Sequence, residues 1–297
     1  METVLRTIGL TKRFKEKVAV NKVNMTIEKG EIYGFIGKNG AGKTTTMKLI
    51  LGLCFADEGK IELFDGQQLD KMRRRIGSLI EAPGLYKNCT AYENMKRFSL
   101  LSGGTDKEIK EYLYLVGLGN TGNKRAGEFS LGMKQRLGIA IALLGKPEFL
   151  VLDEPINGLD PEGIKEIRDV ILMLHREGVT FLISSHLLDE LAKIVTRYGI
   201  ICDGSMIEEI TVTELERRCQ SGLKIVVNDA PKTISVLEGH IRREDMDISG
   251  KNTIFLRTNA EYAGKINSML VKSGIEVREL SVQHGGFENY FIERIGK

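Results

Sequence analysis

The residues with the clearest chemical potential form a glycine-rich loop. Residues 37–44 read GKNGAGKT, which fits the pattern G-x-x-x-x-G-K-[S/T]. An apolar run over residues 32–36 precedes the loop, and helical spacing of apolar residues follows it over 44–53. Glycines let the backbone curl until its N–H groups point inward, and the helix adds its positive N-terminal end. With Lys43 as a cation and the Thr44 hydroxyl as a ligand for Mg²⁺, the loop is predicted to bind the phosphates of a nucleotide.

Two acids stand at the end of another apolar run, over residues 149–152. Because the carboxyl ends of parallel strands meet at one edge of a sheet, Asp153 and Glu154 are expected beside the glycine loop. One carboxylate can hold Mg²⁺, directly or through water, and the next can polarise an attacking water. His186 stands just past a third strand-like run, and at such an edge it is predicted to contact the γ-phosphate.

The segments that must position these residues alternate between strand and helix, which predicts an α/β fold with a mostly parallel sheet. Near the N-terminus, residues 4–10 and 24–27 are typical of strands of an antiparallel β subdomain. A turn is expected after Leu10. Residues 28–31 are predicted to be a hairpin turn that leads into the apolar run at 32–36.

A helical insertion is predicted over about residues 84–145. Thr90 and Glu93 form a capping box that opens its first helix, and further helices are expected over 106–116 and 131–144. Ser130 directly precedes the last of these, so from this stretch alone it is best explained as a helix N-cap.

Beyond residue 212 the pattern changes, which predicts a nucleotide-binding domain over 1–212 and a C-terminal accessory domain over 213–297. The expected elements of the second domain are strands at 223–227, 246–249, 253–258 and 275–282 and helices at 232–238 and 261–273. Their order is β-α-β-β-α-β, as in a ferredoxin-like unit. The predicted fold class is therefore an α/β P-loop NTPase core with an antiparallel β subdomain and a helical insertion, plus a small α+β domain.

Composition narrows the class of protein. The 297 residues carry 43 basic and 40 acidic side chains, so the net charge is +3, too mild to indicate a nucleic-acid binder. No apolar stretch reaches the roughly 18 residues that a membrane span needs, and the N-terminus lacks the features of a secretory signal. The four cysteines are scattered without metal-ligand spacing, so free thiols in a reducing cytoplasm are expected.

Together the motifs resemble the ATP-binding subunits of ABC transporters, over residues 1 to about 212. Residues 37–45 match the Walker A loop of that family, Asp153 and Glu154 end its Walker B strand, and residues 130–133 occupy the place of its signature motif. The resemblance implies that these residues contact ATP: Phe14, Gly37, Lys38, Asn39, Gly40, Ala41, Gly42, Lys43, Thr44, Thr45, Ser130 and Gly132. Phe14 would stack on the adenine.

The same resemblance assigns the remaining roles. It implies Thr44, Asp153 and Glu81 around Mg²⁺ and gives Glu154 and His186 to catalysis. Asp160, in a stretch that resembles the D-loop, is assigned to communication across a dimer.

Two departures from the family pattern are visible. The signature carries Leu131 and Met133 where Gly and Gln are usual, although Ser130 and Gly132 remain. Glu81 stands where the family has the glutamine of its Q-loop. This glutamate and its surroundings resemble the bacitracin-resistance and lantibiotic-immunity branch. An exporter ATPase for another drug or a lipid, with an unrelated substitution at this position, is the alternative.

The resemblance also implies partners. Each ATP would lie between the Walker A loop of one subunit and Ser130 of another, so the chain is expected to form a homodimer or to pair with a related nucleotide-binding domain. Separate membrane permease subunits would supply the pore, which places the chain in the cytoplasm at the inner face of the membrane. No nucleic-acid partner is expected. A soluble ABC ATPase acting on ribosomes or DNA, and a P-loop kinase for a small molecule, are the rival interpretations.

Overall fold

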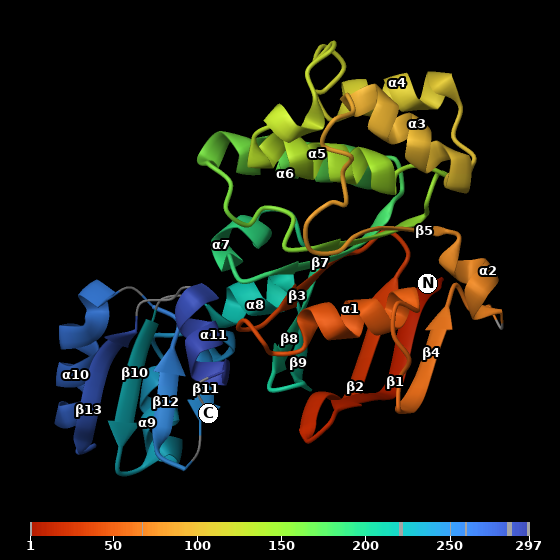
Figure 1. The fold of residues 1–297 in the computed structure, drawn as a ribbon. Helices are drawn as coiled ribbons and strands as arrows, with labels where there is room; N and C mark the ends of the chain where they lie inside the picture. The colour runs from red at the N-terminus through yellow and green to blue at the C-terminus, as the bar shows by residue number, and fades with distance from the viewer. Residues whose placement is uncertain are drawn as a thin grey trace. The chain divides into compact units, whose positions relative to one another are not determined.

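A computed structural model of the chain describes residues 2–66, 68–219, 222–249, 251–258, 260–283 and 287–295. The chain forms two compact units, Met1–Val212 and Thr213–Lys297. Figure 1 shows the elements of each unit in order along the chain.

The first unit is built on a six-stranded sheet whose strand order is β5-β6-β7-β3-β8-β9. Its strands are β3 (Ile32–Ile36), β5 (Ile76–Leu79), β6 (Phe149–Asp153), β7 (Thr180–Ser185), β8 (Arg197–Cys202) and β9 (Ser205–Thr211). All neighbours pair in parallel except β8 and β9, which are antiparallel. Every residue of β3, β6 and β7 is buried, which explains why these strands read as apolar runs without alternation.

A second sheet of this unit has three antiparallel strands in the order β2-β1-β4. They are β1 (Thr3–Phe14), β2 (Lys17–Glu28) and β4 (Glu58–Leu63). The predicted turn after Leu10 is wrong, because β1 continues to Phe14. The register shifts between Thr7 and Leu10, around Gly9 with φ +58°, but the strand does not end there.

The predicted hairpin turn at residues 28–31 is also wrong. β2 and β3 flank this turn but belong to different sheets. The Glu31 N–H does donate to the Glu28 carbonyl over 3.1 Å, so the turn is real. It carries the chain from one sheet to the other instead of pairing its two neighbours, and a local turn pattern does not distinguish these outcomes.

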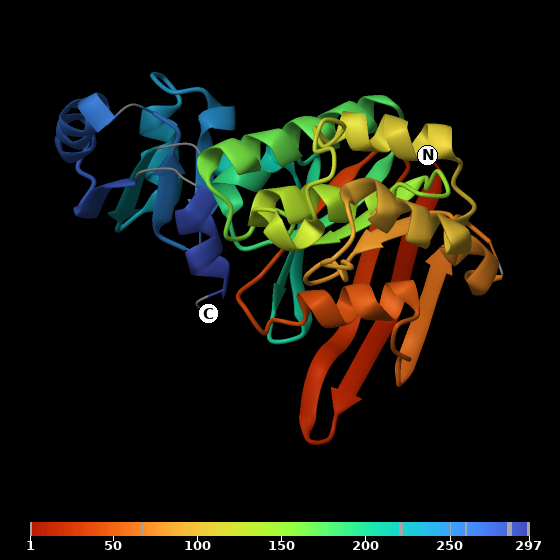
Figure 2. The same cartoon turned by 45° about the horizontal axis from the view of Figure 1, so that its top comes forward.

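Helices surround the two sheets of the first unit. They are α1 (Lys43–Leu51), α2 (Leu69–Arg73), α3 (Ala91–Ser102), α4 (Asp106–Leu115), α5 (Leu131–Ala142), α6 (Pro161–Arg176) and α7 (Leu188–Leu191). Helix α1 packs Met47, Leu49 and Ile50 into one apolar core that includes residues of both sheets. Helices α3, α4 and α5 lie together, away from α1 (Figures 1 and 2).

The helix caps of this region agree with the sequence pattern. Thr90 and Glu93 form the expected capping box at the start of α3. Thr105 and Glu108 form another at the start of α4. A one-turn 3₁₀ helix, Ala126–Glu128, follows before α5.

The second unit contains a four-stranded antiparallel sheet in the order β11-β12-β10-β13. Its elements are α8 (Val212–Arg218), β10 (Gly222–Val227), α9 (Ala230–Leu237), β11 (Met246–Ser249), β12 (Thr253–Leu256), α10 (Ala263–Lys272), β13 (Val277–Gln283) and α11 (Phe287–Ile295), with 3₁₀ turns at Arg243–Asp245 and Ala260–Tyr262. From β10 to β13 the order is β-α-β-β-α-β, as predicted. In neither unit do the described residues include a helix long and apolar enough to cross a membrane.

Candidate active site

Three neighbouring strands of the six-stranded sheet bring the predicted site residues to one edge. Strand β3 leads into the glycine loop, β6 ends at Asp153, and β7 ends one residue before His186. The register pairs Ile36 with Ser185 and Asp153 with Ser184, so the three strands end at the same level. The loop, the acids and the histidine therefore meet at the carboxyl edge of parallel strands, where open α/β sheets bind ligands.

Glycine is required at three positions of the loop. Gly40 and Gly42 have φ of +83° and +106°, a region that other residues rarely adopt. A Cβ at Gly37 would lie 2.4 Å from the Ile201 carbonyl oxygen, and one at Gly42 would lie 2.4 Å from that of Ala19. The loop backbone thus packs directly on the backbone carbonyls of Ile201 and Ala19, and this packing holds its curled shape.

Lys43 is the best-buried charged group of the loop, with 6% of its surface exposed. Its Nζ donates to the carbonyl oxygens of Gly37 over 2.6 Å and Lys38 over 3.4 Å. The same nitrogen lies 3.3 Å from Oε1 of Glu154. A cation is therefore held between the loop and the second acid of the predicted pair.

Thr44 and Asp153, which are predicted to share a metal ion, contact each other. The Thr44 hydroxyl donates to Asp153 Oδ2 over 2.7 Å. The other carboxylate oxygen, Oδ1, accepts from Oγ of Ser184 over 2.5 Å. Ser184 is fully buried. Its Oγ and its carbonyl oxygen also accept the Glu154 N–H, over 2.9 and 3.2 Å. One serine thus holds both acids, and this residue was not predicted.

Glu154 adopts a left-handed backbone conformation with φ +49°. Such a conformation is rare for a residue with a side chain and persists where the surroundings determine it. Its Oε2 lies 2.8 Å from Nδ1 of His186, while Oε1 faces Lys43. The structure therefore brings together the two residues predicted to be catalytic.

A cavity of about 330 Å³ opens over this edge. It is lined by Phe14, Lys17, Ala19, Lys38, Asn39, Gly40, Gly42, Lys43, Thr44, Thr45 and Glu154. The Phe14 ring is 51% exposed, with Lys12 Nζ 5.5 Å from its centroid. An exposed aromatic ring at the mouth of a phosphate-sized cradle can stack on a base.

The predicted signature residues lie elsewhere. Ser130 caps α5, and its Oγ accepts the Met133 N–H over 3.2 Å. With Gly132 and Asp160 it lines a separate cavity of about 520 Å³. A Cβ at Gly132 would meet only Leu159 Cδ2, at 3.7 Å, so the fold of this chain does not itself require glycine here.

Glu81 is not in contact with the other predicted metal ligands in the described part of the chain. It lies two residues beyond Leu79, which pairs with Leu152 across β5 and β6. Its Oε1 lies 2.6 Å from Nζ of Lys48, in α1. The cation that faces Glu81 is thus Lys48, a residue that was not predicted, and not Lys43.

Comparison with known proteins decides the family. A family model described as ABC transporter matches residues 20–157. The bacitracin transport ATP-binding protein BcrA of Bacillus licheniformis is 42% identical over 302 residues, covering 100% of this chain and 98% of that protein. The chain belongs to the ABC transporter ATP-binding proteins. ABC ATP-binding subunits hydrolyse ATP to power transport, so this chain is an ATPase.

Other matches support the same family assignment. The lantibiotic transport ATP-binding protein SrtF of Streptococcus pyogenes is 46% identical over 207 residues, which are 69% of this chain and 90% of that protein. A nucleotide-free ATP-binding cassette from an ABC transporter superposes with a TM-score of 0.66 at 26% identity, over 72% of this chain and 94% of the other. A dimeric cassette bound to ADP and phosphate gives a TM-score of 0.62 at 25% identity, over 70% and 98%.

The residues of this ABC site fit both ATP and its metal. The first N–H groups of α1 have no carbonyl partner within the helix, so they are available to phosphate oxygens. The Thr44 hydroxyl and Asp153 carboxylate offer two adjacent oxygen ligands. No cluster of three or more His, Cys, Asp or Glu side chains suited to a metal occurs among the described residues. The hydroxyl of Thr44 and the carboxylate of Asp153 would suit a Mg²⁺ ion that takes its other ligands from phosphates and water.

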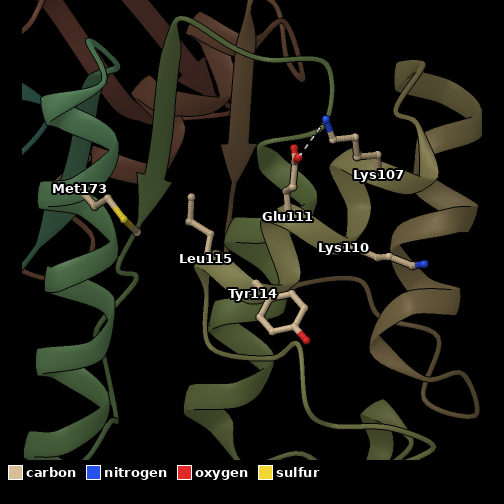
Figure 3. Close-up of a pocket in the computed structure, with 6 residues that line it drawn as sticks. All are labelled: Lys107, Lys110, Glu111, Tyr114, Leu115 and Met173. Atoms are coloured by element: carbon tan, nitrogen blue, oxygen red, sulfur yellow. Dashed lines mark ion pairs between the residues drawn. The ribbon is translucent and has the colours of Figure 1, made fainter.

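A further cavity of this ABC subunit lies between α4 and α6, away from the predicted site residues. Figure 3 shows its lining of Lys107, Lys110, Glu111, Tyr114, Leu115 and Met173. Lys107 and Glu111 pair along α4 at 3.7 Å. None of these six residues belongs to a recognised ABC motif of the chain.

Proposed function

We propose that this ATPase energises export of a peptide antibiotic of the bacitracin or lantibiotic kind through separate membrane subunits. The observation that carries the proposal is the 42% identity to BcrA along the whole chain. Glu81 at the Q-loop position supports it, because a glutamate at this position resembles that branch.

Within the site, we assign roles from the contacts. The loop amides and Lys43 bind the β- and γ-phosphates, and Phe14 stacks on the adenine. Thr44 and Asp153 hold Mg²⁺, which when bound neutralises phosphate charge. Glu154 orients and polarises the attacking water.

His186 contacts the γ-phosphate through the ring nitrogen that Glu154 does not occupy. The 2.8 Å contact between His186 Nδ1 and Glu154 Oε2 fixes the imidazole, so Nε2 is the nitrogen left for phosphate.

The functional unit is a head-to-tail dimer. Ser130 and Gly132 line a different cavity from the Walker A loop, so within one chain they do not share a site with it. The open space around Gly132 and the helix N-terminus at Ser130 suit the phosphates of ATP held by a second subunit. Asp160 lies in the same cavity, where it can register the partner's nucleotide.

Membrane subunits would dock on the helical region. Tyr86 precedes α3, and Leu100 and Leu101 lie near its end; all three are exposed. A membrane subunit that packed on these side chains would remove their apolar surface from water. Through such contacts, the chain would reside at the inner face of the cell membrane.

A drug-sensitivity assay tests the transport proposal. The chain is co-expressed with candidate permeases in a sensitive bacterial host, and the inhibitory concentrations of bacitracin, a lantibiotic and an unrelated ribosomal drug are measured. Resistance to a peptide antibiotic is expected with the wild type and not with Glu154→Gln. Equal sensitivity of both strains to all peptide antibiotics contradicts the proposal.

Co-purification distinguishes the rival functions. The transport proposal expects a polytopic membrane protein to co-purify with the tagged chain from detergent extracts. Recovery of the chain with ribosomes or nucleic acid, without a membrane protein, favours the soluble ABC ATPase instead.

A further inference from the structure

Lys48 and Glu81 form an ion pair at the rim of the nucleotide site. Their charged atoms lie 2.6 Å apart, and the side chains are 36% and 64% exposed. Lys48 lies four residues after Thr44 in α1, so both side chains are on the same face of the helix. The pair therefore links the helix that begins at the Walker A loop to the segment leaving β5.

Each of the two glutamates at this edge faces its own lysine. Leu79 and Leu152 are register partners, and Glu81 and Glu154 each lie two residues further along their chains. Both glutamates have left-handed backbones, with φ of +59° and +49°. Lys43 faces Glu154 at 3.3 Å, as Lys48 faces Glu81.

Lys48 also lies one helical turn from Thr44, whose hydroxyl contacts Asp153. The pKa of Lys48 is raised, chiefly by the hydrogen bond to Glu81, and the charges of Glu81 and Asp153 add to the effect while burial opposes it. A cation entering between Thr44 and Asp153 would compete with Lys48 for Glu81.

We infer that Lys48 is a positioning residue that holds Glu81 beside α1 and competes with bound Mg²⁺ for that carboxylate. The inference rests on the proposed ATPase site and on the metal role that the family resemblance implies for Glu81. The segment that carries Glu81 would then adopt two positions. Glu81 contacts Lys48 in one position and the metal site in the other, and the Lys48 contact sets how much Mg²⁺ is needed to move it.

The test measures Mg²⁺ dependence of nucleotide binding by the purified full chain. A fluorescent ATP analogue is titrated at varied Mg²⁺, with an EDTA sample to confirm that each variant still binds nucleotide. Lys48→Met removes the charge at similar length, Lys48→Gln is a second neutral variant, and Lys48→Arg keeps the charge. An exposed pair of this kind predicts that the half-saturating Mg²⁺ falls about two- to fivefold in both neutral variants, and not in Lys48→Arg.

Hydrogen exchange gives a readout independent of the metal. Amides of residues 80–88 should exchange faster in Lys48→Met than in wild type or Lys48→Arg, because the contact that holds the segment is gone. Unchanged exchange in Lys48→Met and Lys48→Gln contradicts the positioning role.

The Glu81→Gln background distinguishes an effect of Lys48 through Glu81 from the general effect of removing a positive charge near Asp153. Removing any cation near Asp153 strengthens Mg²⁺ binding, whether or not Glu81 moves. If Lys48 acts through Glu81, its replacement should have little effect in the Glu81→Gln background. An equal shift in both backgrounds overturns the inference while leaving the ATPase assignment intact. The result does not depend on which molecule is transported.

Discussion

Ser184 donates a hydrogen bond from Oγ to Oδ1 of Asp153, over 2.5 Å, and the same oxygen accepts the Glu154 N–H over 2.9 Å. A single buried hydroxyl thus orients the carboxylate of Asp153 and holds the backbone N–H of Glu154. Since Oδ1 is occupied by Ser184, Oδ2 is the oxygen presented to Thr44. Residues that orient metal ligands in this way commonly affect function almost as strongly as the ligands themselves.

Ser184→Ala is therefore expected to impair Mg²⁺-dependent ATP hydrolysis by about 10- to 100-fold. Loss of a hydrogen bond to a buried charged group should also lower the free energy of unfolding by about 1.5–3 kcal/mol. Steady-state hydrolysis at varied Mg²⁺ and urea unfolding measure the two effects.

Ser185→Ala is the matched control for that variant. Ser185 is equally buried, but its Oγ accepts the Leu187 N–H over 2.9 Å. It should lose stability without a shift in Mg²⁺ dependence. Identical Mg²⁺ profiles for the two alanine variants would show that Ser184 does not orient the acids.

Glu154→Gln is expected to bind ATP normally and to hydrolyse almost none. The amide keeps the size of the side chain but cannot take a proton from water. The variant should therefore accumulate as an ATP-bound dimer, which size-exclusion chromatography with ATP detects. Glu177→Gln, at the end of α6, is the control. Wild-type turnover in Glu154→Gln would remove Glu154 from the mechanism.

Lys43→Ala is expected to weaken ATP binding at least tenfold, since a charge-assisted contact of this kind contributes about 1.5–3 kcal/mol. Removing Lys43 also leaves Glu154 without its facing cation. Calorimetric titration with ATP measures the change. Lys38→Ala, in the same cavity but exposed, should have a smaller effect. Unchanged affinity in Lys43→Ala contradicts its proposed role.

The sequence was most informative where function depends on neighbouring residues. The Walker A loop could be recognised because its glycines, Lys43 and Thr44 stand together in one short stretch of sequence. The Thr90 capping box likewise depends on contacts within one turn. By contrast, the segment at 28–31 has the pattern of a hairpin turn, and only the sheet partners of β2 and β3 reveal that it is not one.

Lys48 and Ser184 were missed for a related reason. Each acts through a partner distant in the chain, Glu81 for Lys48 and Asp153 for Ser184. Lysine in a helix is usually a solvated side chain, and serine at a strand end attracts no attention by itself. The available signals were the spacing of four residues from Thr44 to Lys48 and a hydroxyl at the end of an apolar strand.

A mixing experiment tests whether Ser130 completes the site of a second subunit. Ser130→Asp keeps an N-cap for α5 but directs negative charge at the partner's phosphates. Mixed with Lys43→Ala protein, it should form dimers with one intact composite site. ATPase activity of the mixture should therefore exceed that of either variant alone. Full activity of demonstrably monomeric wild type rules out this arrangement.

Glu81 should affect coupling more than chemistry. Its carboxylate is replaceable as an oxygen ligand by an amide carbonyl, so Glu81→Gln should retain most ATPase activity of the isolated subunit. Glu81→Ala loses both the Lys48 contact and any metal contact, and the segment after β5 is then no longer tied to the nucleotide site. Peptide-antibiotic resistance should therefore fall far more than ATP affinity in this variant. Measuring affinity, turnover and resistance for both variants decides the matter: a Glu81→Ala strain with undiminished resistance leaves the coupling role without support.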